Sequence, residues 1–222
     1  MKSKISVSVI IPVYNQQLYI GRCLRSLLDQ SLDRESYEII VVNDGSKDKT
    51  ETVLSGFVDE IILKKNNKNM GLPYSLNKGI KFSKGRFIVR VDSDDYVNRE
   101  FLKYIRMYLL YNNEMDAVCC DYYLVDDEEN ILKKMNAIKN PIGCGIMFRA
   151  ESLIKIGMYD RNFKTHEDKD LRIRFLKKHK IDRISLPLYR YRKHSNNITK
   201  NKKNMTKHYK KLVKKHKKVK IK

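Results

Sequence analysis

Apolar residues in the first half of this chain occur either in short continuous runs or at helical spacing. The β-branched runs predict strands over residues 5–13, 38–42, 61–63 and 87–91. Apolar residues at helical spacing predict helices between and after them, over residues 18–28, 46–54, 72–82 and 99–111. This alternation indicates an α/β fold with a mostly parallel central sheet and helices on both faces.

The second half of the chain is less regular. Strands are predicted over residues 117–125, 145–149 and 184–191, and helices over residues 151–156 and 168–178. Pro187 cannot donate a backbone hydrogen bond, so we expect the last strand at an edge of the sheet.

Three residues fall where strands of the predicted sheet end. Tyr14, Asp44 and Asp92 each follow such an end. Ligands of parallel α/β sheets bind outside the carboxyl ends of the strands, so we expect these residues to line one crevice. The turn after the first strand lacks the glycine fingerprint of NAD sites, and the chain has no Walker motif.

Composition adds a polar surface and a basic extension to this picture. Hydrophobic residues make up 41% and charged residues 33% of 222 positions, which suits one globular domain plus an extension. No apolar run approaches the roughly 20 residues that span a bilayer, so we expect a cytoplasmic protein. The four cysteines have no metal-site spacing and are expected to be reduced structural thiols.

The stretch VRVDSDDYV places Asp92, Asp94 and Asp95 after the fourth predicted strand. A solvated turn is one interpretation. An EF-hand loop is disfavoured because Val97 and Lys103 stand where that loop needs glycine and glutamate. Oxygen ligands at a strand end suit Mg²⁺ or Mn²⁺ bound together with substrate phosphates. These residues alone leave the turn and the metal site open.

A second acidic group opens the helix predicted near residue 168. Favourable charge at a helix N-terminus would account for Glu167, Asp168 and Asp170, and a general base among them is the alternative. His194 is either a surface histidine or part of a site. For Tyr14 the alternatives are a core position and stacking on a base; for Asp44 they are a turn residue and a ligand contact.

Taken together, the segments resemble family 2 of the inverting glycosyltransferases, which have the GT-A type nucleotide-diphospho-sugar transferase fold. The matching blocks are SVIIPVYN, DQS, EIIVVNDGSKDKT, NMGLPYSLNKGIKFSKGRFIVRVDSDDYV, GIMFRAESLIKIGMYD, HEDKDLRIR and YRYRKHSNNIT. They follow the family's order. The resemblance implies a glycosyltransferase domain over residues 1–199, with a nucleotide-binding half over 1–97 and an acceptor-binding half over 98–199.

The resemblance also implies site residues by position. The implied contacts to the nucleotide-sugar come from Pro12, Tyr14, Asp44, Asn77 and Asp92. The implied metal ligands are Asp94 and His194, with Asp95 and Glu167 as further candidates, and the implied cofactor is Mn²⁺ or Mg²⁺. Asp168 matches the general base.

One position departs from the family pattern. Leu76 stands before Asn77 where many members carry arginine. We expect the contact of that arginine to be absent, or to be supplied by Lys78 or another cation.

The implied reaction is metal-dependent, inverting transfer of a sugar from a nucleotide-diphosphate donor to a hydroxyl of a glycan or lipid-linked glycan, in the synthesis of surface polysaccharides or glycoconjugates. Acceptor contacts are expected within Asn136–Arg149, where Gly143 and Gly145 indicate a mobile loop. The alternatives are a nucleotidyltransferase on a related fold and a non-catalytic basic nucleotide-binding scaffold.

The segment 200–222 contains 12 lysines and no acidic residue, which is more than half of the net charge of +21. Met205, Tyr209, Leu212 and Val213 share one helical face, which His216 extends. Such an amphipathic helix could lie on an anionic membrane surface at the inner face of the membrane. A disordered, solvated tail is the alternative. No recognition motif indicates a nucleic-acid partner.

Overall fold

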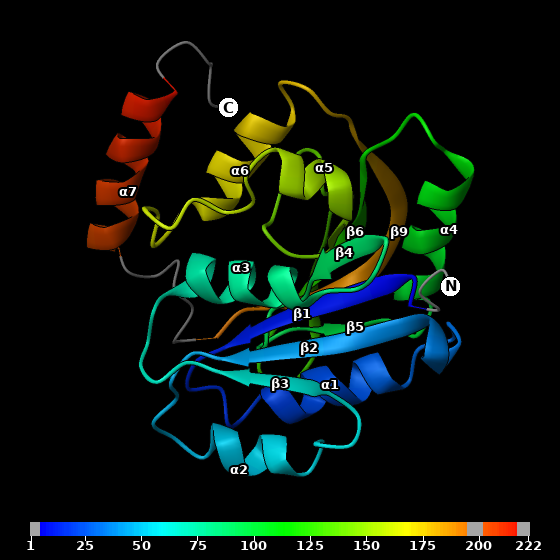
Figure 1. Ribbon diagram of the computed structural model, residues 1–222, viewed down its shortest axis with the longest axis vertical. Coiled ribbons are helices and arrows are strands. Elements are labelled where there is room, and N and C mark those ends of the chain that lie inside the picture. Colours follow the sequence, from blue (N-terminus) through cyan, green and yellow to red (C-terminus); the bar gives the residue numbers. More distant parts are fainter. Residues whose placement is uncertain (1–4, 195–201, 217–222) are drawn as a thin grey trace.

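The computed structural model describes residues 5–194 and 202–216. Over these residues it shows one curled sheet with helices on both faces (Figure 1). The α/β fold with a mostly parallel central sheet is therefore confirmed.

Strands and helices alternate in the first half of the chain. The strands are β1 (Val7–Val13), β2 (Tyr37–Asn43), β3 (Ile62–Lys65) and β4 (Phe87–Arg90). The helices are α1 (Ile20–Leu28), the 3-10 helix η1 (Arg34–Ser36), α2 (Thr50–Ser55) and α3 (Leu72–Phe82). The four strands are parallel in the order β3-β2-β1-β4, so their carboxyl ends lie at one edge of the sheet.

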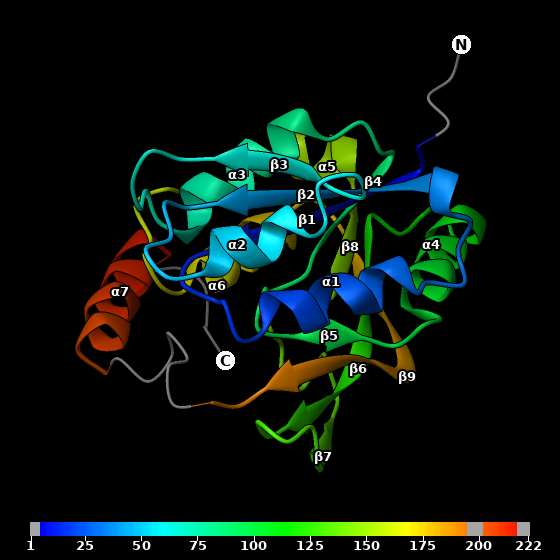
Figure 2. The ribbon, with the colours of Figure 1, turned by 90° about the horizontal axis from the view of Figure 1, so that it is seen from below.

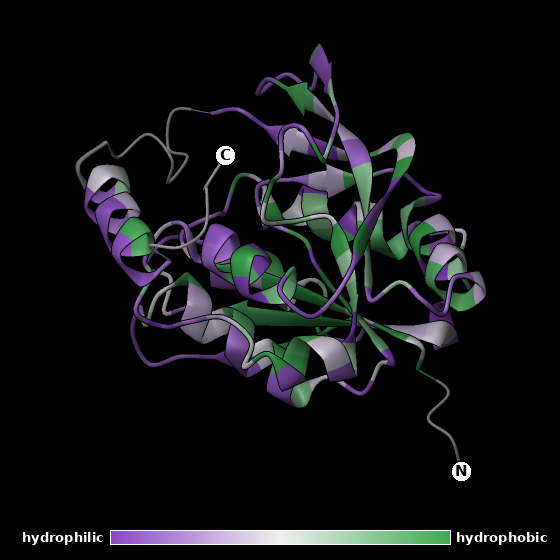
Figure 3. Ribbon diagram, turned by 90° about the horizontal axis from the view of Figure 1, so that it is seen from above, coloured by the Kyte–Doolittle hydropathy of each residue, from purple (hydrophilic) through white to green (hydrophobic). Residues whose placement is uncertain are grey.

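Helices cover both faces of this parallel part. α3 lies on one face, and α1 and α2 lie on the other (Figures 1 and 2). β1 and β2 are accordingly buried at every position, and the central strands are the most hydrophobic part of the molecule (Figure 3). Gly79 allows α3 to approach β1, because a Cβ there would lie 2.5 Å from Cγ2 of Ile10.

The second half completes the sheet with mixed pairing. Its strands are β5 (Tyr96–Val97), β6 (Ala117–Val125), β7 (Ile131–Met135), β8 (Ile146–Arg149) and β9 (Ile181–Arg192). Its helices are α4 (Phe101–Tyr111), α5 (Ala150–Lys155), α6 (Glu167–Phe175) and α7 (Lys202–Lys215). From β4 the sheet continues through β8, β6 and β9 to β5, and β7 pairs with β6.

The expected edge position of β9 is wrong, because β9 lies between β6 and β5. Pro187 is opposite Asp121, where the register with β6 shifts. On its other side β9 meets β5 only at Tyr189 and Arg190. Within the described residues, no second strand therefore requires a backbone N–H from Pro187.

Within the lysine-rich segment, residues 202–215 form α7, which packs beside α6 (Figure 1), and residues 200–201 and 217–222 lie outside the described residues. Of the apolar face predicted for this segment, Leu212 and His216 are buried, together with His208, whereas Tyr209 and Val213 are exposed. No helix in the described ranges is long and apolar enough to cross a bilayer.

Candidate active site

The loops that follow β1 and β2 are held side by side. The Asn15 N–H donates to Ser46 Oγ at 3.0 Å, and the Lys47 N–H donates to Asn15 Oδ1 at 2.8 Å. Tyr14, which is 41% exposed, therefore lies at the carboxyl edge of the sheet, next to the end of β2. Pro12 is buried within β1, two residues before Tyr14.

Asp44 organises the loop that leads into α3. Its carboxylate accepts hydrogen bonds from Asn66 Nδ2 at 2.7 Å, the Met70 N–H at 2.9 Å and the Gly71 N–H at 2.8 Å. A carboxylate offers about four acceptor positions. Asp44 therefore has capacity for one further donor, although its residue is only 3% exposed.

Asn77 is fully engaged within the fold. Its Nδ2 donates to the Tyr159 carbonyl at 2.8 Å, and its Oδ1 accepts from the Tyr159 N–H at 3.0 Å. Asn77 is also buried, and its side chain joins α3 to the segment before α6. Leu76 lies in the core, and Lys78 donates to Asn66 Oδ1, directly behind Asp44.

Arg90 joins the two acidic motifs. Its Nε and Nη2 donate to the two carboxylate oxygens of Asp92 at 2.6 and 3.0 Å, and its Nη1 donates to Glu167 Oε1 at 3.0 Å. Arg90 is buried at the end of β4. Burial, with Asp168 adding and Arg90 opposing, raises the pKa of Glu167 to about 7. The sequence analysis did not single out Arg90; an arginine inside an apolar strand just before DSDD was its only signal.

The two predicted metal ligands, Asp94 and His194, lie together. His194 Nε2 is 2.8 Å from Asp94 Oδ2, and the Tyr19 ring packs 4.8 Å from the imidazole ring. Arg192 Nε donates to the Asp94 carbonyl at 3.0 Å, which fixes the loop that carries Asp94. A carboxylate suits Mg²⁺ or Mn²⁺, whereas an imidazole is a nitrogen ligand typical of later transition metals such as zinc and iron.

Asp95 is committed to the fold. Its Oδ2 accepts from the Tyr189 hydroxyl at 2.7 Å, and its Oδ1 accepts from the Arg192 N–H at 2.8 Å. Asp92, Asp95 and Cys144 also form a compact group of possible ligand atoms within 4.8 Å of one another. This group fits Mg²⁺ or Mn²⁺ poorly, because burial raises the pKa of the Cys144 thiol and a thiol ligand must be deprotonated.

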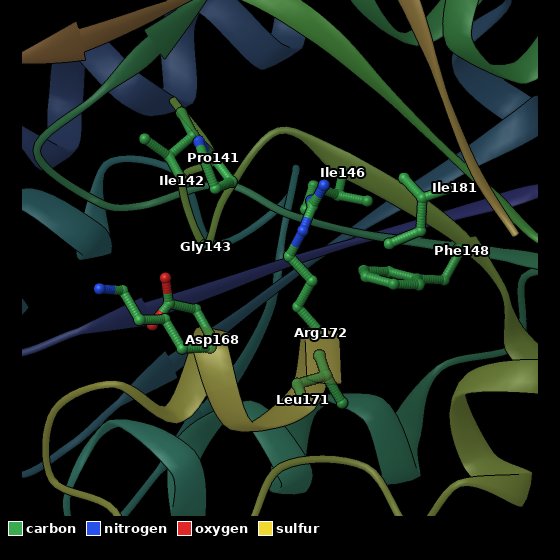
Figure 4. Close-up of a pocket in the computed structure, with 10 residues that line it drawn as sticks. Pro141, Ile142, Gly143, Ile146, Phe148, Asp168, Leu171, Arg172 and Ile181 are labelled. Atoms are coloured by element: carbon green, nitrogen blue, oxygen red, sulfur yellow. The ribbon is translucent and has the colours of Figure 1, made fainter. Parts of the chain in front are cut away.

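Asp168 lies in the first turn of α6 and is partly exposed. It borders a small cavity together with Gly143 (Figure 4). A Cβ at Gly143 would lie 2.8 Å from Asp168 Cβ and 3.0 Å from Arg90 Nη1. The loop before β8 therefore needs glycine to pass this close to α6. His166, at φ +62°, adopts the left-handed conformation just before α6.

Comparison with known proteins places these residues in a family. The model of the glycosyl transferase family 2 matches residues 8–169. The chain belongs to this family. The matched segment runs from β1 into α6.

Two relatives illustrate the sequence identity between this family member and curated proteins, and the share of each chain that the match covers. An uncharacterized glycosyltransferase of Rickettsia typhi is 33% identical over 189 residues, which cover 77% of this chain and 58% of that protein. The poly(ribitol-phosphate) beta-glucosyltransferase of Bacillus spizizenii is 39% identical over 100 residues, covering 43% of this chain and 16% of that protein. The chain thus spans little more than half of the length of the Rickettsia typhi protein.

Solved structures share the fold of this chain. The crystal structure of S. aureus TarS with UDP-GlcNAc matches with a TM-score of 0.81 at 21% identity, covering 98% of this chain and 68% of that one. The mannosyltransferase PcManGT of Pyrobaculum calidifontis, in complex with GDP-Man and Mn²⁺, matches with a TM-score of 0.75 at 17% identity, covering 97% and 65%.

Proposed function

We propose that this glycosyltransferase inverts the anomeric centre as it moves a sugar from a nucleoside-diphosphate donor to a hydroxyl of a glycan or lipid-linked glycan. The observation that carries the proposal is the Arg90 bridge, which joins Asp92 to Glu167, the residue beside Asp168. The bridge holds the donor end of the crevice and the helix with the general base in one rigid unit.

The donor binds at the strand ends in this proposal. Pro12 and Tyr14 form a wall for the nucleotide base, and Asp44 accepts a hydrogen bond from it. Asp92, held on both oxygens by Arg90, stands nearest the ribose. Asn77 acts indirectly, by positioning the segment before α6. Solved structures of the same fold with UDP-GlcNAc and GDP-Man support a donor of this class.

Asp94 and His194 would hold Mn²⁺ or Mg²⁺, and PcManGT, crystallised with Mn²⁺, supports this choice. A bound divalent ion supplies positive charge for the leaving diphosphate. Asp95 and Glu167 are not ligands in this proposal, because Tyr189 holds Asp95 Oδ2 and Arg90 holds Glu167 Oε1 within the fold.

Asp168 acts as the general base in this proposal. The acceptor hydroxyl attacks the anomeric carbon on the side opposite the leaving group while its proton passes to a carboxylate oxygen of Asp168. The bond from the anomeric carbon to the diphosphate oxygen breaks as the new bond forms, so the configuration inverts.

The acceptor belongs to surface polysaccharide or glycoconjugate synthesis in this proposal. The relative from Bacillus spizizenii is named for poly(ribitol-phosphate), a phosphate-bearing polymer. The minor teichoic acid biosynthesis protein GgaB of Bacillus subtilis is 28% identical over 181 residues. A cytoplasmic site of action, peripheral at the inner face of the membrane, is part of the same proposal.

A donor screen with Mn²⁺ tests the proposed reaction. The full chain is incubated with UDP- and GDP-sugars, and the released nucleotide is identified. We expect one donor to yield its nucleoside diphosphate. A nucleotidyltransferase would release pyrophosphate instead, and a non-catalytic scaffold would bind donors and release neither product.

A further inference from the structure

The lysine-rich helix α7 contacts the turn at which α6 begins. Nε2 of His166 donates to the Met205 carbonyl at 3.2 Å, and Oγ1 of Thr165 donates to the Asn204 carbonyl at 3.5 Å. His166 is the residue just before α6, and Asp168 is the second residue of that helix. The backbone of α7 therefore holds the chain within two residues of the proposed base.

His166 depends on such contacts because its backbone is left-handed, with φ +62°. In a residue other than glycine this conformation is uncommon, and it persists where surrounding contacts hold it. The His166 ring is buried and packs against the Tyr209 ring of α7, with 5.9 Å between the ring centroids. The His166 carbonyl also accepts the Asp170 N–H at 3.0 Å, which closes the first turn of α6. The start of α6 is thus tied to α7.

A second contact holds α6 at Asp170, which is completely buried. Its Oδ1 is 2.7 Å from Lys215 Nζ and 2.8 Å from His216 Nε2, both at the end of α7. Its Oδ2 accepts from Arg174 Nε at 2.8 Å. A buried carboxylate needs such partners, and Lys215 also pairs with Asp160, in the segment before α6, at 2.8 Å. α7 therefore binds α6 again two residues after the proposed base.

The residue between these two contacts and next to the base is held from the sheet. Arg90, at the end of β4, donates to Glu167 Oε1 at 3.0 Å. Asp168 itself is partly exposed. α7 lies outside residues 8–169, which match the family model, so this hold on α6 comes from a segment beyond the matched one.

We propose that α7 sets the position of Asp168, and that His166 and Lys215 are the positioning residues through which it acts. The proposal rests on the proposed function for the role of Asp168 as the base. A displacement of about 1 Å between reacting groups can lower a rate about 100-fold, so turnover requires α7 to be docked on α6. The proposed donor contacts come from the ends of β1, β2 and β4, so donor affinity does not depend on α7.

Hydrogen exchange of the full chain tests this hold without turnover. His166→Asn removes the ring and its Nε2 but keeps a residue that tolerates the left-handed backbone. Lys215→Met removes the charge that binds Asp170. We expect the backbone amides of residues 167–171 to exchange about tenfold faster in both variants than in the wild type, because the first turn of α6 opens more readily. Wild-type protection of β1 and β2 shows that each variant folds.

His179→Asn and Lys214→Met are the matched controls. His179 lies beyond the other end of α6, where its Nδ1 is 3.0 Å from Asp116 Oδ1, and Lys214 is exposed on α7. We expect both controls to leave exchange in residues 167–171 within about twofold of the wild type. Unchanged exchange in His166→Asn or Lys215→Met would overturn the proposal, and so would equal acceleration in the controls.

Kinetics test the positioning role with the donor identified by the screen. His166→Asn and Lys215→Met should lower kcat by about 10-fold to 100-fold and leave donor affinity within about twofold. Lys215→Arg keeps the positive charge and should recover part of kcat, and the two controls should keep the wild-type kcat. An equal loss of donor affinity would show general damage to the fold and contradict the proposal.

The two measurements separate this proposal from the proposed function. Faster exchange in residues 167–171 with an unchanged kcat would overturn the positioning role, although α7 would still hold α6. If the wild type turns over no donor, the proposed function fails, while the exchange result still decides whether α7 holds the first turn of α6.

Discussion

Arg90 is the residue that converts two separate acidic motifs into one site. A sequence motif shows only that Asp92 and Glu167 are present, whereas the arginine fixes their distance and shares its charge between them. Glu167 is buried where it binds Arg90, and this burial raises the pKa of Glu167 to about 7. The raised pKa can be measured through the pH dependence of stability.

We predict that this raised pKa makes stability depend on pH. The native state retains the Glu167 proton to higher pH than the unfolded chain does, so the stabilisation is complete below about pH 4.5 and is lost as pH rises through about 7. Melting temperatures from pH 5 to 8 should fall less steeply for Glu167→Gln than for the wild type. Glu128→Gln, at an exposed position, should keep the wild-type slope. Parallel slopes for wild type and Glu167→Gln would contradict the prediction.

Asp94 carries the second prediction at this scale. Asp94→Ala should abolish the part of nucleotide binding that depends on Mn²⁺, because it removes the carboxylate beside His194. Calorimetry with the nucleotide of the identified donor, with and without Mn²⁺, measures this. Asp59→Ala serves as the control, because it removes an exposed carboxylate that is not part of the proposed site. Undiminished Mn²⁺-dependent binding by Asp94→Ala would remove Asp94 from the metal site.

At the scale of helices and strands, the sequence predicted an element where its apolar residues are regularly spaced and missed it where they are not. α3 has the predicted bounds, Leu72–Phe82, because its apolar spacing is regular and a proline starts it. β7 was missed because four of its five residues are exposed, so no buried face repeats along it. β5 has two residues, too few for any pattern.

The rotation of α7 about its axis has an electrostatic reason. Hydropathy favours Tyr209 and Val213, yet Asp170 is completely buried and draws Lys215 and His216 toward it. Ionic partners on α6 therefore set the rotation of α7. The same limit applies to the site, because no sequence pattern predicted that Asn77 would bind the Tyr159 backbone.

Docking of α7 should depend on Leu212, which is completely buried. Leu212→Ala is expected to lower the free energy of unfolding by about 2 to 5 kcal/mol if α7 unfolds together with the domain. Val213→Ala, at the adjacent exposed position, should change it by less than about 0.5 kcal/mol. Urea unfolding measures both, and equal effects would show that α7 does not pack as described.

At the scale of the whole molecule, α7 presents a largely hydrophilic outer side (Figure 3). Lys207 and Lys210 are exposed on it, and membrane attraction is worth about 1 kcal/mol per lysine. We predict that Lys207→Ala with Lys210→Ala weakens sedimentation with anionic liposomes by roughly 30-fold. Lys133→Ala with Lys134→Ala, the same charge loss on β7, should have little effect. Equal binding by both double variants would contradict a membrane role for α7.

The carboxyl ends of the parallel strands are the proposed donor site, and α6 carries a single partly exposed carboxylate. Catalysis by that carboxylate is the central claim. The most direct test compares Asp168→Asn with the wild type, measuring nucleoside diphosphate release and donor binding on the same preparations. We predict that turnover falls by about 100-fold to 10,000-fold, while donor affinity stays within about twofold. Turnover near the wild-type rate would contradict the assignment of Asp168 as the base.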